Sequence, residues 1–218
     1  GGRTAPNETG VSAFKQSSDD VACLWYDGQI KPNDVLLVFV SSHGKIVGNR
    51  FMILQSGYNP KYERVAVDFK TDLLEVLGNI QCKKLVFLDA CHSGGAKEGY
   101  GGLSQAVVDL AKAQPGVSTL TSCGSTEKSY EDQAWENGAF TEALLEAFSN
   151  TACQDAAGAF RADANGDRIL RLGELYDFLR RRVPGMVQTQ IPNAPTSQTP
   201  FMPESQLDKE LPVYFLEN

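Results

Sequence analysis

The sequence predicts an α/β protein with a mostly parallel central sheet and helices on both faces. Two continuous apolar runs, residues 35–40 and 85–88, are rich in Val, Leu and Phe. Runs of this kind are typical of strands that are buried on both faces, as in parallel sheets. Segments with apolar residues at helical spacing follow them along the chain. Strands that alternate with helices predict a sheet that is covered on both sides.

Two further elements are expected between these two runs. Residues 51–54 predict a short strand, separated from the first run by a loop that contains glycine. Residues 68–80 carry apolar side chains at helical spacing, with Asp68 or Thr71 as candidate N-cap residues. This helix would lead the chain back to the second apolar run.

The second half of the chain predicts three helices and two strands. Its last helix is expected to stop at Pro184, because proline removes a main-chain hydrogen bond. Arg180, Arg181 and Arg182 would then lie at its C-terminus, where positive charge interacts favourably with the helix dipole. No stretch resembles a linker between large domains, so residues 1–218 are expected to form one domain. We expect the helices at 103–113, 140–148 and 172–183, and the strands at 117–123 and 211–216.

The composition excludes several classes of function. The 20 Lys and Arg residues are outnumbered by 27 Asp and Glu residues, and a net charge of −7 disfavours nucleic-acid binding. No run approaches the roughly 18–20 apolar residues that span a bilayer, and the polar start shows no signal peptide. Five scattered cysteines without a CxxC pair favour a reducing compartment over disulfides or zinc. We therefore expect a cytoplasmic protein with no nucleic-acid or membrane partner.

Candidate catalytic groups follow the two buried strands. The first run leads into Ser-Ser-His43-Gly, and the second leads into Asp89-Ala-Cys91-His-Ser-Gly. Because the carboxyl ends of parallel strands meet at one edge of a sheet, His43 and Cys91 are expected to lie close together. A cysteine nucleophile needs an imidazole beside its thiol, because the imidazole favours the thiolate form. The imidazole can also protonate a leaving amine.

The neighbours of this pair extend the prediction. Gly44 has no side chain, so a substrate carbonyl could approach its N–H, and the N–H groups of Gly44 and Cys91 are candidate oxyanion-hole donors. The period of two along a strand places Asp89 on the side of Cys91, and Ser41 on the side of His43. A carboxylate at Asp89 would favour Arg or Lys in the pocket for the residue before the scissile bond.

Each motif has a plainer interpretation when it is taken alone. A single cysteine after a strand is more often an inert core thiol, and a single His-Gly pair is more often a turn. Here two strand ends carry complementary groups in a chain that has only two histidines. The two motifs together therefore favour catalysis.

These motifs resemble those of the caspase-like cysteine peptidases (peptidase family C14), most closely the metacaspases and bacterial orthocaspases. His43 precedes Cys91 by 48 positions, close to the roughly 50 that separate the pair in caspases. The resemblance covers about residues 33–215, and includes the stretches Gly-Ala-Phe-Thr141 and Gln198-Thr-Pro. It implies a three-layer caspase-like sandwich.

The resemblance also implies how the chain is divided. About residues 1–135 would form a large-subunit-like part, and about residues 136–218 a small-subunit-like part. The family's first strand is expected to be missing, because residues 1–32 contain no convincing version of it. The chain would then be the larger part of a longer precursor.

Carried over residue by residue, the resemblance implies specific roles. His43 would be the general base and acid, and Cys91 the nucleophile. Asp89 would form the acidic floor of the first specificity pocket, with Ser41 beside His43 in the same pocket. Asp132, from the loop after the third strand, would complete that pocket.

The implied function is a cysteine endopeptidase that cuts a protein or peptide after Arg or Lys in signalling, defence or cell death. It would be a zymogen, activated by cleavage of the loop at 96–102 or 124–137, and regulated by another protein or by the rest of its precursor. Asp89 would repel an acidic residue, unlike the pocket of caspases that cut after Asp. Legumain-like peptidases share the His-Gly and Ala-Cys-x-Ser-Gly pattern and are an alternative for specificity. The alternative function is a catalytically silent scaffold for protein contacts.

One further segment resembles a calcium site. Asp163, Asn165, Asp167 and Glu174 match positions 1, 3, 5 and 12 of an EF-hand loop, but Arg168 stands where the tight turn needs glycine. The plainer interpretation is a turn, a short extended piece and a helix start with an acidic first turn. Similar stretches recur in bacterial caspase-like domains, so we favour it and expect no cofactor. Calcium remains the alternative because some metacaspases need it, and a calcium-binding regulatory module is the third functional hypothesis.

Overall fold

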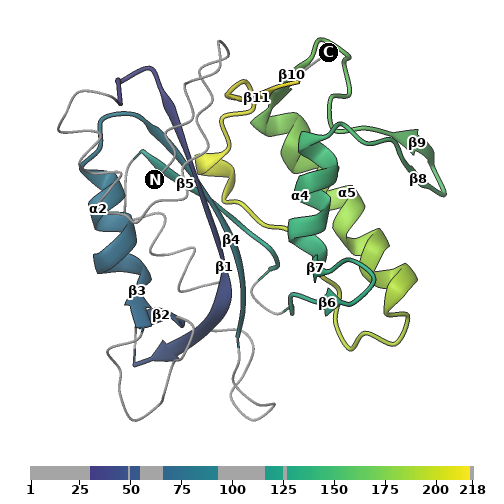
Figure 1. The fold of residues 1–218 in the computed structure, drawn as a ribbon, viewed down its shortest axis with the longest axis horizontal. Helices are drawn as coiled ribbons and strands as arrows, with labels where there is room; N and C mark the ends of the chain where they lie inside the picture. Colours follow the sequence, from purple (N-terminus) through teal and green to yellow (C-terminus); the bar gives the residue numbers. More distant parts are fainter. Residues whose placement is uncertain (1–29, 49, 55–65, 93–115, 125–126, 217–218) are drawn as a thin grey trace.

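A five-stranded sheet forms the centre of the computed structural model, in the order β3-β2-β1-β4-β5 (Figure 1). The structure describes residues 30–48, 50–54, 66–92, 116–124 and 127–216. The expected helix at 103–113 and the loop at 96–102 lie outside these residues, as does most of the segment 1–32. The strands are β1 (Val35–Val47), β2 (Arg50–Leu54), β3 (Ala66–Asp68), β4 (Lys83–His92) and β5 (Val117–Thr121).

The sheet is mixed, with a parallel part and an antiparallel part. β1, β4 and β5 are parallel to one another, as predicted, whereas β2 and β3 pair antiparallel. The connection from β1 to β2 explains the change of direction, because Val47 pairs with Arg50, only three positions further along the chain, and Gly48 forms a turn after Val47. Such a short connection can join only antiparallel strands. Gly48 adopts φ +62° in this turn, a conformation that favours glycine.

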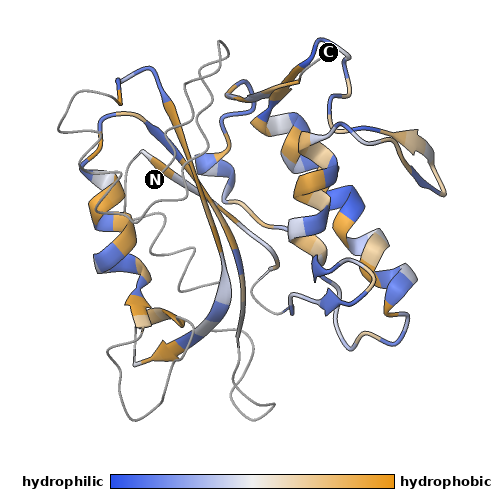
Figure 2. Ribbon diagram, viewed as in Figure 1, coloured by the Kyte–Doolittle hydropathy of each residue, from blue (hydrophilic) through white to orange (hydrophobic). Residues whose placement is uncertain are grey.

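Helices cover both faces of the sheet, so the predicted α/β sandwich is confirmed. Along β4, Leu85 and Phe87 pack into a core with α4 and α5, while Val86 and Leu88 pack with the helical segment on the other face. Figure 1 shows α2 on one side of the sheet and α4 and α5 on the other, and Figure 2 shows apolar residues along β1 and β4. The helices are η2 (Phe69–Leu74), α2 (Glu75–Gly78), α4 (Ala139–Phe148) and α5 (Leu172–Gln190).

The helical segment after β3 begins where the sequence predicts. The Asp68 carboxylate accepts hydrogen bonds from the main-chain N–H groups of Lys70 (2.9 Å) and Thr71 (3.2 Å). Asp68 is therefore the N-cap residue of the two candidates. The segment is not one continuous α-helix, because a π-helical stretch, η2, precedes the single α-helical turn of α2.

The helix α5 does not stop at Pro184, as predicted, but continues to Gln190. Met186 and Val187, which follow the proline, are only 4% and 3% exposed in the core. Burial of each such side chain contributes about 1.5–3 kcal/mol, which offsets a helix-interior proline that costs about 3 kcal/mol. The arginines therefore lie within the helix, where Arg181 and Arg182 pair with acidic side chains instead of closing its C-terminus.

Three two-stranded ribbons complete the described part of the chain. They are β6 (Glu131–Asp132) with β7 (Asn137–Gly138), β8 (Cys153–Asp155) with β9 (Gly158–Phe160), and β10 (Ile169–Arg171) with β11 (Pro212–Phe215). A short 3-10 helix, η3 (Glu204–Gln206), lies near the edge strand β5, where the Gln206 side chain accepts a hydrogen bond from Thr119 N–H. None of the helices in the described ranges is long and apolar enough to cross a membrane.

Candidate active site

The parallel strands β1 and β4 bring the two predicted catalytic positions together. His43 of β1 is the register partner of Cys91 of β4, and Ser41 is the partner of Asp89. Neighbouring strands lie about 4.8 Å apart, so the main chains of His43 and Cys91 are adjacent. Both strands continue past the apolar runs that predict them, because β1 reaches Val47 and β4 reaches His92. The pair therefore lies on the strands themselves rather than in loops after them.

Side chains on one face of β1 are exposed to solvent from Phe39 to His43, because successive side chains of a strand point to opposite faces. Phe39, Ser41 and His43 are exposed, whereas Val40 and Ser42 between them are less so. The register partners of Phe39 and Ser41 are Phe87 and Asp89, so this face is the one that carries α4 and α5. His43 is thus accessible to a substrate on the same face of the sheet as the Asp89 carboxylate.

Asp89 is a buried carboxylate held by two hydroxyl groups. Asp89 is only 7% exposed, yet no Lys or Arg in the described ranges forms an ion pair with its carboxylate. Ser129 Oγ donates to Asp89 Oδ1 at 2.9 Å, and Thr141 Oγ1 donates to Oδ2 at 2.6 Å. Burial of an unpaired charge is costly, so a cation that reached this carboxylate would be strongly favoured.

The two donors come from different elements. Ser129 precedes β6, and Thr141 lies in the first turn of α4. Gly138, the N-cap residue of α4, comes so close that an added Cβ would lie 2.8 Å from Asp89 Oδ2. The sequence singles out the stretch 138–141 only through the family resemblance, and it gives no sign that Thr141 contacts Asp89, 52 positions away.

A buried glutamine, Gln198, donates a hydrogen bond to Ser129. Gln198 is 0% exposed, and its Oε1 accepts the N–H of Tyr130 at 2.8 Å. Its Nε2 donates to the carbonyl of Ser122 and to Ser129 Oγ, each at 3.1 Å. Its stretch Gln198-Thr-Pro belongs to the resemblance, but no local pattern assigns it to the site.

Asp132 is not connected to Asp89 in the part of the chain that the structure describes. Its carboxylate accepts hydrogen bonds from Ala134 N–H (2.8 Å) and from Gln190 Nε2 (3.3 Å). The groups that contact Asp89 from this loop and helix are instead Ser129 and Thr141. The role predicted for Asp132 stays a prediction.

Gly44 is buried within β1 rather than in a turn. It lies in register between Ile53 of β2 and His92 of β4. Gly44 therefore lies next to His43 on the same strand. The oxyanion role of Gly44 and Cys91 stays a prediction.

Comparison with known proteins identifies the family. The family model of the caspase domain (peptidase C14) matches residues 16–210, which is well over half of the chain. The chain belongs to the caspase-domain family. Among solved structures, it is similar to caspase-1 from Spodoptera frugiperda, with 18% sequence identity, a TM-score of 0.48, and coverage of 90% of this chain and 70% of that chain. A search of curated proteins gave no match.

Three of the five cysteines of this caspase domain are buried free thiols. They are Cys82, Cys123 and Cys153. Burial raises the pKa of Cys82 and Cys153, and only the thiolate is strongly nucleophilic. Cys23 lies outside the described residues. Burial therefore argues against these three thiols as the nucleophile.

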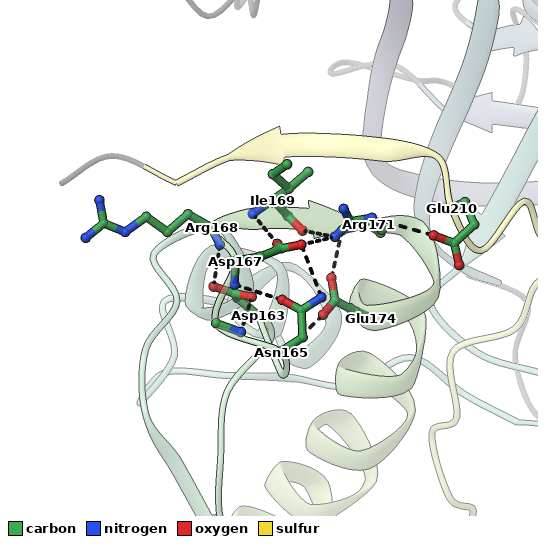
Figure 3. Close-up of polar contacts among 9 residues, drawn as sticks. Asp163, Asn165, Asp167, Arg168, Ile169, Arg171, Glu174 and Glu210 are labelled. Atoms are coloured by element: carbon green, nitrogen blue, oxygen red, sulfur yellow. Dashed lines mark hydrogen bonds and ion pairs between the residues drawn. The ribbon is translucent and has the colours of Figure 1, made fainter.

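The calcium-like loop of the caspase domain uses its oxygens internally (Figure 3). The Asp163 carboxylate accepts the N–H groups of Gly166 (2.9 Å) and Arg168 (3.1 Å), and Asp167 pairs with Arg171 at 2.7 Å. In the ranges that the structure describes, no group of three or more His, Cys, Asp or Glu residues is arranged to hold a metal.

The local structure of this loop matches its plainer interpretation. A turn leads into the short strand β10 and then into α5, and the Glu174 carboxylate accepts the N–H of Arg171 at 3.2 Å. Arg168 adopts φ +66° at the position where an EF-hand has glycine. The expectation of no cofactor stays a prediction.

Proposed function

We propose that this caspase domain is a cysteine endopeptidase that hydrolyses peptide bonds after Arg or Lys through a Cys91–His43 dyad. The observation that carries the proposal is the register pairing of His43 with Cys91 on adjacent parallel strands. The exposure of His43 on the face that carries Asp89 supports it further. A catalytically silent scaffold would have no need for this pairing.

The reaction proceeds in two steps at the thiol. His43 takes the proton of Cys91, and the thiolate sulfur attacks the carbonyl carbon of the scissile bond. The amides of Gly44 and Cys91 bind the oxyanion that forms. The C–N bond then breaks, and His43 transfers its proton to the departing amine. Water, deprotonated by His43, hydrolyses the thioester and releases the carboxylic acid and the free thiol.

Specificity for a basic side chain follows from the Asp89 carboxylate. It is buried, it is held by two neutral hydroxyl groups, and no cation pairs with it within the described ranges. An Arg or Lys of the substrate would supply the missing positive charge in a charge-assisted hydrogen bond. An Asp in the same place would meet a like charge.

The biological setting is proposed on the same basis. A peptidase with this selectivity fits regulated proteolysis in the cytoplasm, in signalling, defence or cell death. Activation would cut a surface loop, at 96–102 or 124–137, and the substrates would be proteins or peptides.

The test is peptide cleavage by the wild type and matched variants. Fluorogenic peptides ending in Arg, Lys, Asp or Asn are offered with calcium added or chelated. We expect turnover after Arg and Lys, its loss in Cys91→Ala and His43→Ala, and its retention in Cys82→Ala, which removes a buried thiol from the residue before β4. Absence of Cys91-dependent turnover on every peptide would favour the scaffold. Turnover after Asp but not Arg would contradict the role of Asp89.

A further inference from the structure

A series of hydrogen bonds leads from Gln198 through Ser129 to Asp89, and the donor and acceptor of each bond can be assigned. It begins at the amide of Gln198, whose Oε1 must be the acceptor because it faces the N–H of Tyr130. Nε2 is then the donor, and its two protons go to the carbonyl of Ser122 and to Ser129 Oγ. All three polar contacts of this fully buried side chain are therefore assigned without ambiguity.

Ser129 accepts a hydrogen bond from Gln198 and donates one to Asp89. A hydroxyl has one proton, and because Ser129 Oγ accepts from Gln198, its own proton is available for Asp89 Oδ1. On the other side, Thr141 Oγ1 donates to Oδ2 at 2.6 Å, a short distance typical of a hydroxyl bound to a carboxylate. Within the described ranges, each carboxylate oxygen thus accepts one hydrogen bond from a hydroxyl group and keeps one acceptor site for another donor.

The carboxylate is also confined in space. Gly138 lies against Oδ2 so closely that even a Cβ would not fit. Ser129, Gly138 and Thr141 all come after β5 along the chain, whereas Asp89 lies on β4. The orientation of the carboxylate is therefore set by the second half of the chain, not by its own strand.

We propose that Gln198, Ser129 and Thr141 are positioning residues that determine specificity by fixing the Asp89 carboxylate for a planar guanidinium. The inference rests on the proposed function, since it concerns the same substrate pocket. Arg presents a rigid fork of donors that needs both oxygens in a fixed plane, whereas Lys presents a point charge that tolerates a rotated carboxylate. Loss of a positioning residue should therefore weaken cleavage after Arg more than cleavage after Lys.

The first test removes single hydroxyl groups. The test variants Thr141→Val and Ser129→Ala each remove one hydroxyl donor to Asp89. Two controls are compared with them: Thr141→Ser keeps the hydroxyl donor, and Thr189→Val removes an exposed hydroxyl that donates to the carbonyl of Gly185 in α5. We expect the first two variants to lower kcat/KM after Arg by roughly 10- to 100-fold, chiefly through KM, with a smaller loss after Lys. Thr141→Ser and Thr189→Val should keep the wild-type ratio of Arg to Lys cleavage.

The second test asks whether Gln198 acts through Ser129. Gln198→Met removes the donor at similar volume, so it should lower the Arg-to-Lys ratio in the wild type but not in a Ser129→Ala background. Melting temperatures of all variants separate unfolding from a change in specificity. An unchanged ratio in folded Thr141→Val and Ser129→Ala, with an active wild type, would overturn the positioning role alone. An inactive wild type would overturn the proposed function and this inference with it.

Discussion

Gly138 leaves no room for a side chain beside Asp89. Its φ of −72° is open to any residue, so the requirement for glycine comes from space and not from conformation. In Gly138→Ala the new methyl group would displace the Asp89 carboxylate, because the Cβ would lie 2.8 Å from Oδ2. We expect kcat/KM after Arg to fall by at least roughly tenfold.

The matched control for this substitution is Gly185→Ala. In the part of the chain that the structure describes, an added Cβ at Gly185 meets nothing within 4 Å, and the residue lies inside α5. We expect full activity and a gain of about 0.5–1 kcal/mol in the free energy of unfolding, measured by urea denaturation. Wild-type kcat/KM in Gly138→Ala would show that Asp89 can move without loss of function.

Two threonines on β5 differ in how their hydroxyl groups are satisfied. Among the described residues, Thr119 Oγ1 is buried without a hydrogen-bond partner, whereas Thr121 Oγ1 contacts the carbonyls of Cys123 (2.9 Å) and Phe201 (3.2 Å). Thr119→Val should therefore be neutral or stabilising by up to about 1 kcal/mol, because it removes an unpaired polar group. Thr121→Val should cost about 1–2 kcal/mol. Urea denaturation of both variants checks the prediction, and equal losses at the two positions would contradict it.

At the scale of elements, an exposed arginine attaches the β8–β9 ribbon to α5. Arg181 forms a bidentate ion pair with Asp155, with two N–O distances of 2.6 Å, and lies over the Phe160 ring at 3.9 Å from its centroid. The hydrogen bond from Arg181 lowers the pKa of Asp155 to about 2. The ribbon is thus held to the helix by a charge and an aromatic contact together.

This ion pair predicts a pH dependence of stability. Because the pKa of Asp155 is lower in the folded state than the ordinary value of 3.8, the pair stabilises the fold above pH 3.8. That contribution should be lost as the pH falls toward 2. We expect the melting temperature of the wild type to exceed that of Asp155→Asn at pH 5, and the difference to shrink toward pH 2. A difference that is constant between pH 5 and pH 2 would contradict the assignment.

The elements also show where local sequence patterns succeed. The apolar runs predict β1 and β4 because strands buried on both faces contain little but apolar residues. The same logic ends the predicted strands too early, because polar side chains such as Ser41, His43 and Asp89 interrupt the apolar runs although the strands remain paired in register there. The sequence also predicts the end of α5 too early, at Pro184. The helix continues because Met186 is buried by tertiary packing, which local sequence does not show.

At the scale of the whole molecule, the pairing of His43 with Cys91 is predictable, but the contacts that hold Asp89 are not. His43 and Cys91 can be paired from sequence because parallel strands align their carboxyl ends, whatever the separation along the chain. The contacts of Asp89 with Ser129 and Thr141 span 40 and 52 positions and depend on how α4 packs on the sheet. No periodicity along the chain encodes such a contact, and only the assembled fold shows it.

The net charge of the whole chain predicts how substrates approach it. With 27 acidic against 20 basic residues, the protein should attract cationic peptides over distances longer than any single contact. Two peptides with the same Arg at the cleavage site, one flanked by Lys and one flanked by Glu, should therefore differ in kcat/KM at low salt. Salt reduces the Debye length from about 30 Å at 0.01 M to about 8 Å at 0.15 M, so the two values should converge. Because the proposed Asp89 contact is common to both peptides, the salt-dependent part of their difference reports the long-range attraction, and equal salt dependence of the two would rule out steering by the net charge.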